Sequence, residues 1–342
     1  MAGNYYDTYI VTGATGYIGS MLVRRILSEG SNVALVVRNL SKAEKIFDNE
    51  IGKANIKIFV SDVTDPDGMK SAAKEIAHDK KIKNAALIHA ASETKSKYML
   101  DNPAETLDTI ILGTRNVLEM MRSCDGKIKS MVHLSSMEAY GIVSLPEGER
   151  AGEEMLGMID MTSPRSSYPL GKRTAEFYCM LYAKEFGVPV KVARLAQVFG
   201  AGVPSDDSRA FAQFARAAMT GEDIVLETSG ESMGNYCSID EAIDAIMLIL
   251  REGKNGETYN VVNEENTMRV RDMARVALDT LGTGAGRVIT NVGNGKANVY
   301  APNTKLMMSG KKLAALGFSP RKSLADMYRD LARDKKTSNP TS

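Results

Sequence analysis

Three glycines separate an apolar run from an amphipathic run near the start of the chain. Gly13, Gly16 and Gly19 lie in the segment TGATGYIGS, residues 12–20, directly after the apolar residues 9–11. The residues that follow repeat apolar side chains at three- and four-residue spacing, which predicts a helix. Glycine at such a junction indicates a tight turn or a close approach of the backbone to another group. The segment therefore predicts a strand, a tight turn and a helix whose first amide groups are open to an anion.

The first 200 residues repeat this strand and helix alternation. Strand-like runs end at six positions, and helix-like runs separate them: Val11, Val37, Val60, His89, Leu134 and Leu195. Parallel strands need such helical crossovers, so residues 1–200 predict an α/β domain with a doubly wound parallel sheet of the Rossmann type. We expect residues 201–330 to form mainly a smaller C-terminal α/β subdomain that binds the substrate. Within that half, 236–262 should return to the first domain, and 331–342 should be a polar tail.

Composition excludes several classes of protein. The 342 residues carry 43 basic and 42 acidic side chains, a net charge of +1, which offers no electrostatic attraction to nucleic acid or an anionic membrane. The three cysteines are far apart and odd in number, so they predict neither a disulfide framework nor a zinc site, and we expect no metal. No apolar run has membrane-spanning length, and the first residues do not resemble a signal peptide. We therefore expect a cytoplasmic protein.

A dinucleotide pyrophosphate fits the glycine turn. The residues that would hold it are Gly13, Thr15, Gly16, Tyr17, Ile18 and Gly19. The second strand ends at Arg38, about 20 residues past the glycines, where an acidic residue commonly binds the 2′-hydroxyl of NAD. A guanidinium can instead pair with a 2′-phosphate, so Arg38, helped by Lys42, favours NADP over NAD. The alternative for Arg38 is a solvated side chain at a strand end.

Two further strand ends are candidates for cofactor contact. Asp62 and Val63 follow the third strand and could flank the adenine. The small residues Ala90, Ala91 and Ser92 follow the fourth strand and would let a flat cofactor lie against the backbone.

A tyrosine and a lysine stand four residues apart in SSYPLGKRTAE. This spacing puts Tyr168 and Lys172 on one face of a predicted helix. A nearby ammonium favours the phenolate and lowers the pKa of a tyrosine, so Tyr168 could act as a general base. Ser136, after the fifth strand, could orient the substrate oxygen. The alternative is an ordinary pair on a helix surface.

Five motifs in order resemble the extended short-chain dehydrogenase/reductases, the NAD(P)-dependent epimerases and dehydratases of nucleotide sugars. They are TGATGYIGS, IHAAS, GTRNVLEMM, SSMEAYG and YPLGK. The resemblance implies that Ser136 is the catalytic hydroxyl, with Ser135 as the alternative, that Tyr168 is the base, and that Lys172 is its partner and also holds the nicotinamide ribose. It further implies a nucleotide-sugar substrate and a homodimer.

Within this family the chain looks most similar to the branch of UDP-glucuronate decarboxylases and nucleotide-sugar 4-epimerases. The frame PRSSYPLGKRTAE carries the likeness, and Glu138 falls where decarboxylases and 4,6-dehydratases have a working glutamate. Glu138 could equally be a loop carboxylate that orients a neighbour. Met137 replaces the acidic aspartate of the dehydratases, and a thioether cannot donate a proton, which argues against dehydration.

Three positions depart from the family pattern. Gly234 stands where an arginine usually clamps the substrate diphosphate, Gln197 replaces an asparagine, and Ile110 replaces another. Arg209 matches an arginine of the decarboxylase branch, so Arg209 and Tyr236 are the candidate substrate-binding residues of the second half.

The leading interpretation is an enzyme that oxidises C4 of a nucleotide sugar to a 4-ketone and then returns the hydride, as a 4-epimerase or a decarboxylase does. One alternative is an NADPH-dependent reductase of a ketone or aldehyde, which Arg38 would suit. Another is a non-catalytic dinucleotide sensor, although a sensor has no need of a tyrosine base.

Overall fold

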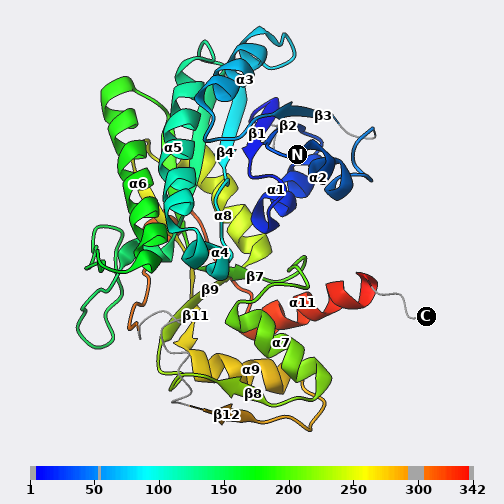
Figure 1. Ribbon diagram of the computed structural model, residues 1–342, viewed down its shortest axis with the longest axis vertical. Helices are drawn as coiled ribbons and strands as arrows, with labels where there is room; N and C mark the ends of the chain where they lie inside the picture. The colour runs from blue at the N-terminus through cyan, green and yellow to red at the C-terminus, as the bar shows by residue number, and fades with distance from the viewer. Residues whose placement is uncertain (1–4, 53–54, 292–303, 339–342) are drawn as a thin grey trace. The chain divides into compact units, whose positions relative to one another are not determined.

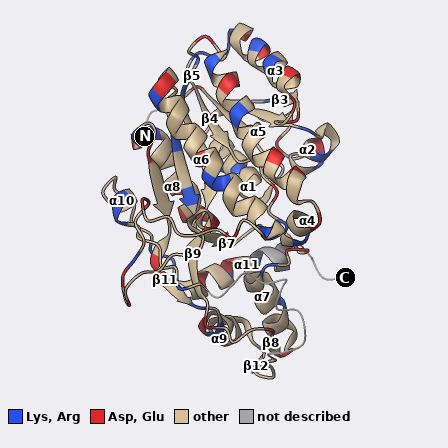
Figure 2. Ribbon diagram, turned by 60° about the vertical axis from the view of Figure 1, so that its left-hand side comes forward, with Lys and Arg blue, Asp and Glu red and all other residues tan. Residues whose placement is uncertain are grey.

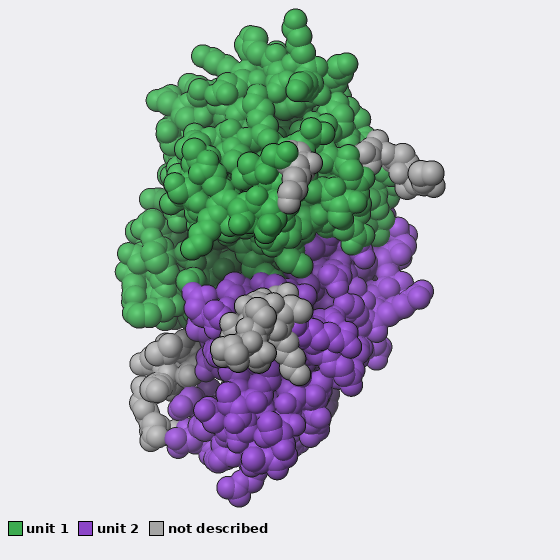
Figure 3. Space-filling view, turned by 90° about the vertical axis from the view of Figure 1, so that its right-hand side faces the viewer, with its two compact units in different colours: residues 1–139, 159–194, 245–259 green, residues 140–158, 195–244, 260–342 purple. Residues whose placement is uncertain are grey.

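The computed structural model describes residues 5–52, 55–291 and 304–338. The chain forms two compact units, which Figure 3 colours separately. Unit 1 contains residues 1–139, 159–194 and 245–259, and unit 2 contains 140–158, 195–244 and 260–342. The chain thus passes between the units several times. Of the segment 236–262, residues 245–259 belong to unit 1.

A seven-stranded sheet forms the centre of unit 1 (Figure 1). Its strands, in spatial order, are β10 (Thr258–Val261), β6 (Val190–Leu195), β5 (Ile128–Ser136), β4 (Ala85–His89), β1 (Thr8–Thr12), β2 (Asn32–Val37) and β3 (Ile56–Val60). The pairs β1–β2, β1–β4, β2–β3 and β4–β5 are parallel. The predicted doubly wound α/β fold is confirmed, and the strand ends lie within two residues of their predicted positions.

Helices cross over between these strands. They are α1 (Tyr17–Ser28), α2 (Leu40–Ile46), α3 (Pro66–His78), α4 (Ser96–Asp101), α5 (Pro103–Arg122), α6 (Ser167–Phe186) and α8 (Ile239–Glu252), with 3₁₀ turns η1 (Met137–Tyr140) and η2 (Pro164–Ser166). Helix α8 starts in unit 2 and ends in unit 1.

One hydrophobic core lies between the sheet and helices α3, α5 and α6. Side chains alternate between the two faces of a strand, so Ile10, Ala34 and Val36 belong to this core, together with Val117 of α5 and Cys179 of α6. Helix α1 packs against β1 and β2 from the other side of the sheet (Figure 1). Burial on both faces explains why the central strands read as nearly continuous apolar runs.

Unit 2 contains two small sheets and their helices. Its elements are β7 (Gln197–Phe199), α7 (Ala210–Thr220), β8 (Ile224–Leu226), β9 (Met233–Ser238), β11 (Asn263–Arg269), α9 (Val270–Leu281), β12 (Val288–Thr290), α10 (Lys311–Ala314) and α11 (Leu324–Ser338). Strand β9 pairs antiparallel with β11 and parallel with β7, and β12 pairs parallel with β8. The predicted tail is helical as far as Ser338, and residues 339–342 lie outside the described part of the chain.

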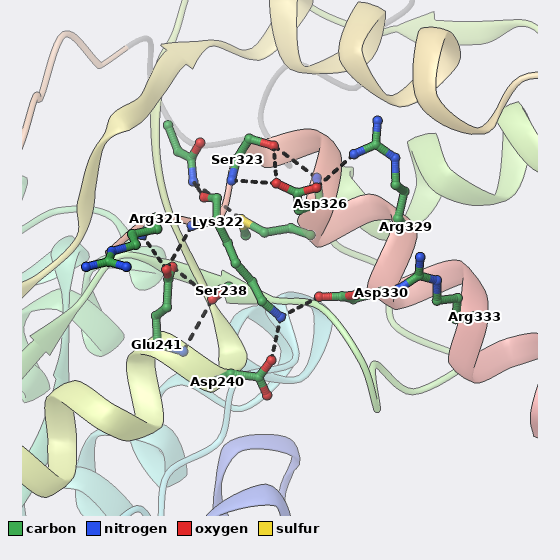
Figure 4. Close-up of polar contacts among 12 residues, drawn as sticks. Ser238, Asp240, Glu241, Arg321, Lys322, Ser323, Asp326, Arg329, Asp330 and Arg333 are labelled. Carbon is green, nitrogen blue, oxygen red and sulfur yellow. Dashed lines mark hydrogen bonds and ion pairs between the residues drawn. The ribbon is translucent and has the colours of Figure 1, made fainter. Parts of the chain in front are cut away.

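A polar network ties α11 to the start of α8 (Figure 4). The Lys322 ammonium is 2.6 Å from Asp240 and 2.5 Å from Asp330. One carboxylate oxygen of Glu241 accepts the amides of Arg321 and Lys322, at 2.5 and 2.8 Å. These contacts attach the segment before α11 by main-chain as well as side-chain bonds.

Charges of both signs are interspersed along the helices (Figure 2), in keeping with the nearly equal numbers of basic and acidic residues. Within the described ranges, none of the helices combines the length and the apolar character that a membrane span requires.

Candidate active site

The glycine turn brings the backbone of the loop against the end of β4. Gly13 has φ +67°, a left-handed conformation that favours glycine, and a Cβ there would lie 2.5 Å from main-chain atoms of Ala90 and Ala91. A Cβ at Gly19 would overlap the Gly13 carbonyl oxygen. Helix α1 begins directly after Gly16, which has no side chain to cover its first amides. Glycine at position 16 thus leaves no side chain of that residue over the first amides of α1, the arrangement that anion sites at helix starts use.

Of the residues predicted for the adenosine end of the cofactor, Arg38 and Asp62 lie near each other. Arg38 is largely exposed, and its guanidinium lies 4.0 Å from the Asp62 carboxylate. Asp62 is oriented by the amide and hydroxyl of Thr64, at 2.9 and 2.8 Å. Val63 is buried, and its carbonyl accepts a bond from Asn116. Lys42 is exposed in the first turn of α2, and its amide donates to the Asn39 cap.

Two buried histidines lie behind the ends of β4 and β5. His89 contacts the hydroxyls of Thr12 and Thr114, at 2.7 and 3.2 Å. Burial, reinforced by the Lys172 charge, lowers the pKa of His89 to about 3. The ring of His133 is 5.2 Å from that of His89, and neither of its nitrogens has a hydrogen-bond partner among the described residues. Both rings are therefore neutral at physiological pH.

Two of the predicted catalytic residues, Tyr168 and Lys172, lie close together on α6 near the end of β5. Tyr168 and Lys172 project from the first turns of α6, and the Lys172 nitrogen is 5.6 Å from the centre of the Tyr168 ring. Lys172 is buried and donates to the Leu134 carbonyl at 2.9 Å. Burial lowers the pKa of Lys172 to about 8, and the Glu176 charge opposes this shift. The ammonium is therefore the main form at neutral pH.

Helix α5 approaches this part of α6 closely. A Cβ at Gly171 would lie 3.1 Å from the end of Ile110. Ile110 packs with Met99, Tyr168 and Ala175. The isoleucine that replaces the family's asparagine thus forms part of the apolar wall around Tyr168.

The two adjacent serines have different surroundings. Ser135 donates to the Glu176 carboxylate at 2.5 Å and is buried. Ser136 is half-buried and accepts the amide of Glu138 at 3.2 Å. Within the described residues its hydroxyl proton has no acceptor, so the geometry leaves Ser136 available to bind a substrate oxygen.

Glu138 and Tyr168 line one small pocket with Arg165. The other lining residues are Ser96, Met99 and Leu100. The Arg165 guanidinium is 3.8 Å from the Glu138 carboxylate. Burial raises the pKa of Glu138, and the charge of Arg165 opposes that shift. Arg165 is not among the site residues predicted from the sequence, although its place in the Pro-Arg-x-x-Tyr frame, three residues before Tyr168, was a usable signal.

The two candidate substrate residues belong to unit 2. Arg209 forms a two-pronged ion pair with Asp207, with contacts of 3.0 and 2.5 Å, and lies 4.7 Å from the centre of the Phe211 ring. Tyr236 is 1% exposed and packs edge-on against Phe199. A Cβ at Gly234 would overlap the Tyr236 hydroxyl. The tyrosine ring thus fills the space into which a longer side chain at position 234 would extend.

No group of three or more histidine, cysteine or acidic side chains is arranged to hold a metal ion in the described parts of the chain. The three cysteines are free thiols and buried.

Comparisons with known proteins place the chain in a family. The model of the NAD dependent epimerase/dehydratase family matches residues 9–262. UDP-glucuronic acid decarboxylase 1 of Xenopus tropicalis is 26% identical over 277 residues, which are 80% of this chain but only 60% of the relative's length. UDP-glucuronic acid decarboxylase 6 of Arabidopsis thaliana is 28% identical over 74% of this chain and 68% of its own.

Solved structures show the same fold. A UDP-glucose 4-epimerase of Thermotoga maritima, solved with UDP-glucose, has a TM-score of 0.80 at 21% identity and covers 97% of this chain and 99% of its own. A UDP-glucuronic acid 4-epimerase of Bacillus cereus, solved with UDP-glucuronic acid and NAD, has a TM-score of 0.76 at 19% identity, with 97% and 99% coverage. The family model spans well over half of the residues, and the chain therefore belongs to the NAD dependent epimerase/dehydratase family.

Proposed function

We propose that this chain is an NAD(P)-dependent enzyme that acts on C4 of a nucleotide sugar, as a UDP-glucuronic acid decarboxylase or 4-epimerase does. The observation that carries the proposal is the pair Tyr168 and Lys172 of α6, which lies at the end of β5 because Lys172 donates to the Leu134 carbonyl. Ser136 follows Leu134 by two residues, and Tyr168 shares a pocket with Glu138. Bound NAD(P) would accept the hydride from C4 and later return it. Gly13 and Gly19 supply the compact loop in which its diphosphate fits.

The chain's own residues supply proton transfer and orientation. Tyr168 takes the proton of the C4 hydroxyl, Lys172 stabilises the phenolate, and Ser136 donates to the oxygen that gains charge. When the ketone is reduced again, Tyr168 gives the proton back to the oxygen at C4.

A sugar acid suits the pocket beside Tyr168 best. Arg165 is a cation that could pair with a carboxylate at C6, and Glu138 places a second carboxyl group in the same pocket. In a decarboxylation the C5–C6 bond breaks, carbon dioxide leaves, and C5 takes a proton, which Glu138 could deliver. Relatives named as UDP-glucuronic acid decarboxylases support this substrate class.

Three finer points belong to the same proposal. Arg38 and Lys42 are exposed where a 2′-phosphate would lie, which favours NADP over NAD.

Exposed apolar side chains on α5 and α6 support a homodimer through these helices. They are Leu112, Phe177 and Phe186. Three free thiols suit a reducing compartment, so we place the protein in the cytoplasm.

The experiment is to identify the cofactor and then test turnover. The purified protein is denatured and the released dinucleotide identified by mass spectrometry, and UDP-glucuronic acid is incubated with wild type and Tyr168→Phe. We expect a retained oxidised dinucleotide, conversion of the nucleotide sugar by wild type, and a loss of about 10²- to 10⁴-fold in rate for the variant with cofactor still bound.

Other outcomes would redirect the assignment. A protein that binds neither dinucleotide contradicts the proposal. An empty protein that binds NADPH reversibly and oxidises it with a ketone or aldehyde favours the reductase, the candidate that Arg38 supports. Equal function of wild type and Tyr168→Phe favours the dinucleotide sensor.

A further inference from the structure

A buried ion pair lies directly behind the candidate catalytic residues. Tyr168, Lys172 and Glu176 follow one another at four-residue intervals on α6, so they share one face of the helix. Glu176 forms a two-pronged pair with Arg194 of β6, with Nε–Oε1 and Nη2–Oε2 distances of 3.0 and 2.5 Å. The side chains of Glu176 and Arg194 are only 8% and 2% exposed.

The pair is connected to the end of β5 by consecutive residues. The Leu134 carbonyl accepts the Lys172 ammonium, and the Ser135 hydroxyl donates to Glu176 at 2.5 Å. Ser136, the next residue, carries the hydroxyl that is available for substrate. The contacts made by Leu134 and Ser135 therefore determine where Ser136 lies relative to α6.

The titratable groups around Lys172 come from three elements. Helix α6 contributes Tyr168, Glu176 and Cys179, β4 contributes His89, and β5 contributes His133. Burial keeps both histidines neutral and raises the pKa of the Cys179 thiol, so that it stays protonated. Among these groups Glu176 is the one that forms an ion pair, with Arg194, and Arg173 is a further cation near it.

We propose that Glu176 is a positioning residue that holds Lys172 charged and, through Ser135, keeps Ser136 in place beside Tyr168. The inference rests on the proposed function for its catalytic meaning, but its physical content concerns the charge state of Lys172. A carboxylate one helical turn from a buried ammonium stabilises the charged form, because little water screens the interaction. Loss of that charge would leave Lys172 less able to stabilise the Tyr168 phenolate.

The first test measures Lys172 without any substrate. Lysines are labelled with ¹³C at Cε, the Lys172 resonance is assigned by its disappearance in Lys172→Arg, and its pH titration is followed by NMR. We expect Glu176→Gln to lower the titration midpoint of Lys172 by about one pH unit, since the neutral amide no longer offsets burial. An unchanged midpoint in a folded Glu176→Gln protein overturns the proposal.

Tyr182→Phe is the matched control. Tyr182 is another buried residue of α6, and its hydroxyl donates to Glu119 at 2.6 Å, so the variant also removes a strong bond from this helix. It should leave the Lys172 midpoint unchanged. An equal shift in Tyr182→Phe would mean that the effect is general loosening of α6, and it also overturns the proposal.

A second variant allows the same measurement if Glu176→Gln does not fold. Glu176→Gln removes the carboxylate that pairs with the buried Arg194 guanidinium, whereas the double variant Glu176→Gln, Arg194→Met replaces both charges by uncharged side chains, which folded proteins often tolerate. Glu176 stands one helical turn from Lys172 on α6, whereas Arg194 belongs to β6. The midpoint should therefore move in the same direction by a smaller amount, and no movement in the double variant counts against Glu176.

Turnover separates this inference from the proposed function. If UDP-glucuronic acid is a substrate, Ser135→Ala, which keeps the Glu176 charge, should lower kcat about fivefold with KM within about twofold, since the Ser136 position matters most in the transition state. Wild-type kcat in Ser135→Ala overturns the positioning of Ser136. If no nucleotide sugar reacts with wild type, the proposed function fails, and the NMR titration still decides whether Glu176 governs Lys172.

Discussion

At the scale of single residues, Gly13 shows how one missing Cβ shapes the cofactor loop. Gly13 and Gly30 both have a positive φ, +67° and +79°. Of these two, only Gly13 lies so close to the main chain after β4 that an added Cβ would overlap it. Gly30→Ala should cost about 1 kcal/mol of folding free energy for the left-handed conformation alone. Gly13→Ala adds a clash with the backbone, for a total of roughly 2–5 kcal/mol. Urea unfolding of both variants measures the difference, and equal losses would mean that the loop yields to the added methyl group.

At the scale of elements, Glu241 shows how a carboxylate attaches α11 in unit 2. Its oxygens accept two main-chain amides before α11 and the Ser238 hydroxyl (Figure 4). Glu241→Ala should destabilise the docking of α11 by roughly 2–4 kcal/mol, because two amides lose their acceptor. The control Arg329→Ala removes an exposed ion pair with Asp326 and should cost less than about 1 kcal/mol. Hydrogen exchange of the amides of α11, read by mass spectrometry, should be faster in Glu241→Ala only. Equal exchange in both variants would assign the docking of α11 to its apolar contacts.

At the scale of the whole molecule, His89 and His133 make the fold sensitive to acid. Their folded-state pKa values lie below the ordinary 6.5, because burial and the Lys172 charge disfavour protonation. Above pH 6.5 the two histidines are mainly neutral in both the folded and the unfolded state. Below pH 6.5 they bind protons in the unfolded chain but stay neutral in the folded chain. Stability should therefore fall by roughly 1.4 kcal/mol per pH unit for each histidine, from pH 6.5 down to about 3 for His89. Urea unfolding at several pH values measures the slope. His133→Leu should reduce it and also raise stability at pH 7, since its ring nitrogens have no partners among the described residues; an unchanged slope would rule out His133 as a source.

Much of the architecture was predictable because it follows from local patterns. The strands that end at Val37, His89 and Leu195 were predicted to the residue, since each is a buried apolar run followed by a turn or polar segment. The sheet β11-β9-β7 was not predicted. Its strands Met233–Ser238 and Asn263–Arg269 mix polar and apolar side chains without regular alternation, so pairing within the sheet, rather than a local pattern, makes them strands.

What the sequence by itself determined is the set of groups that can do chemistry and the elements that carry them. The glycine spacing, the strand ends and the four-residue interval from Tyr168 to Lys172 are local, and backbone geometry converts them directly into positions on a turn, a sheet edge and a helix face. Only the tertiary structure decided the state of those groups. It engaged Ser135 with Glu176 and left Ser136 available, placed Arg165 beside Glu138, and buried Lys172. Charge state and hydrogen-bond partners depend on desolvation and on neighbours from distant segments, and no spacing along the chain encodes these.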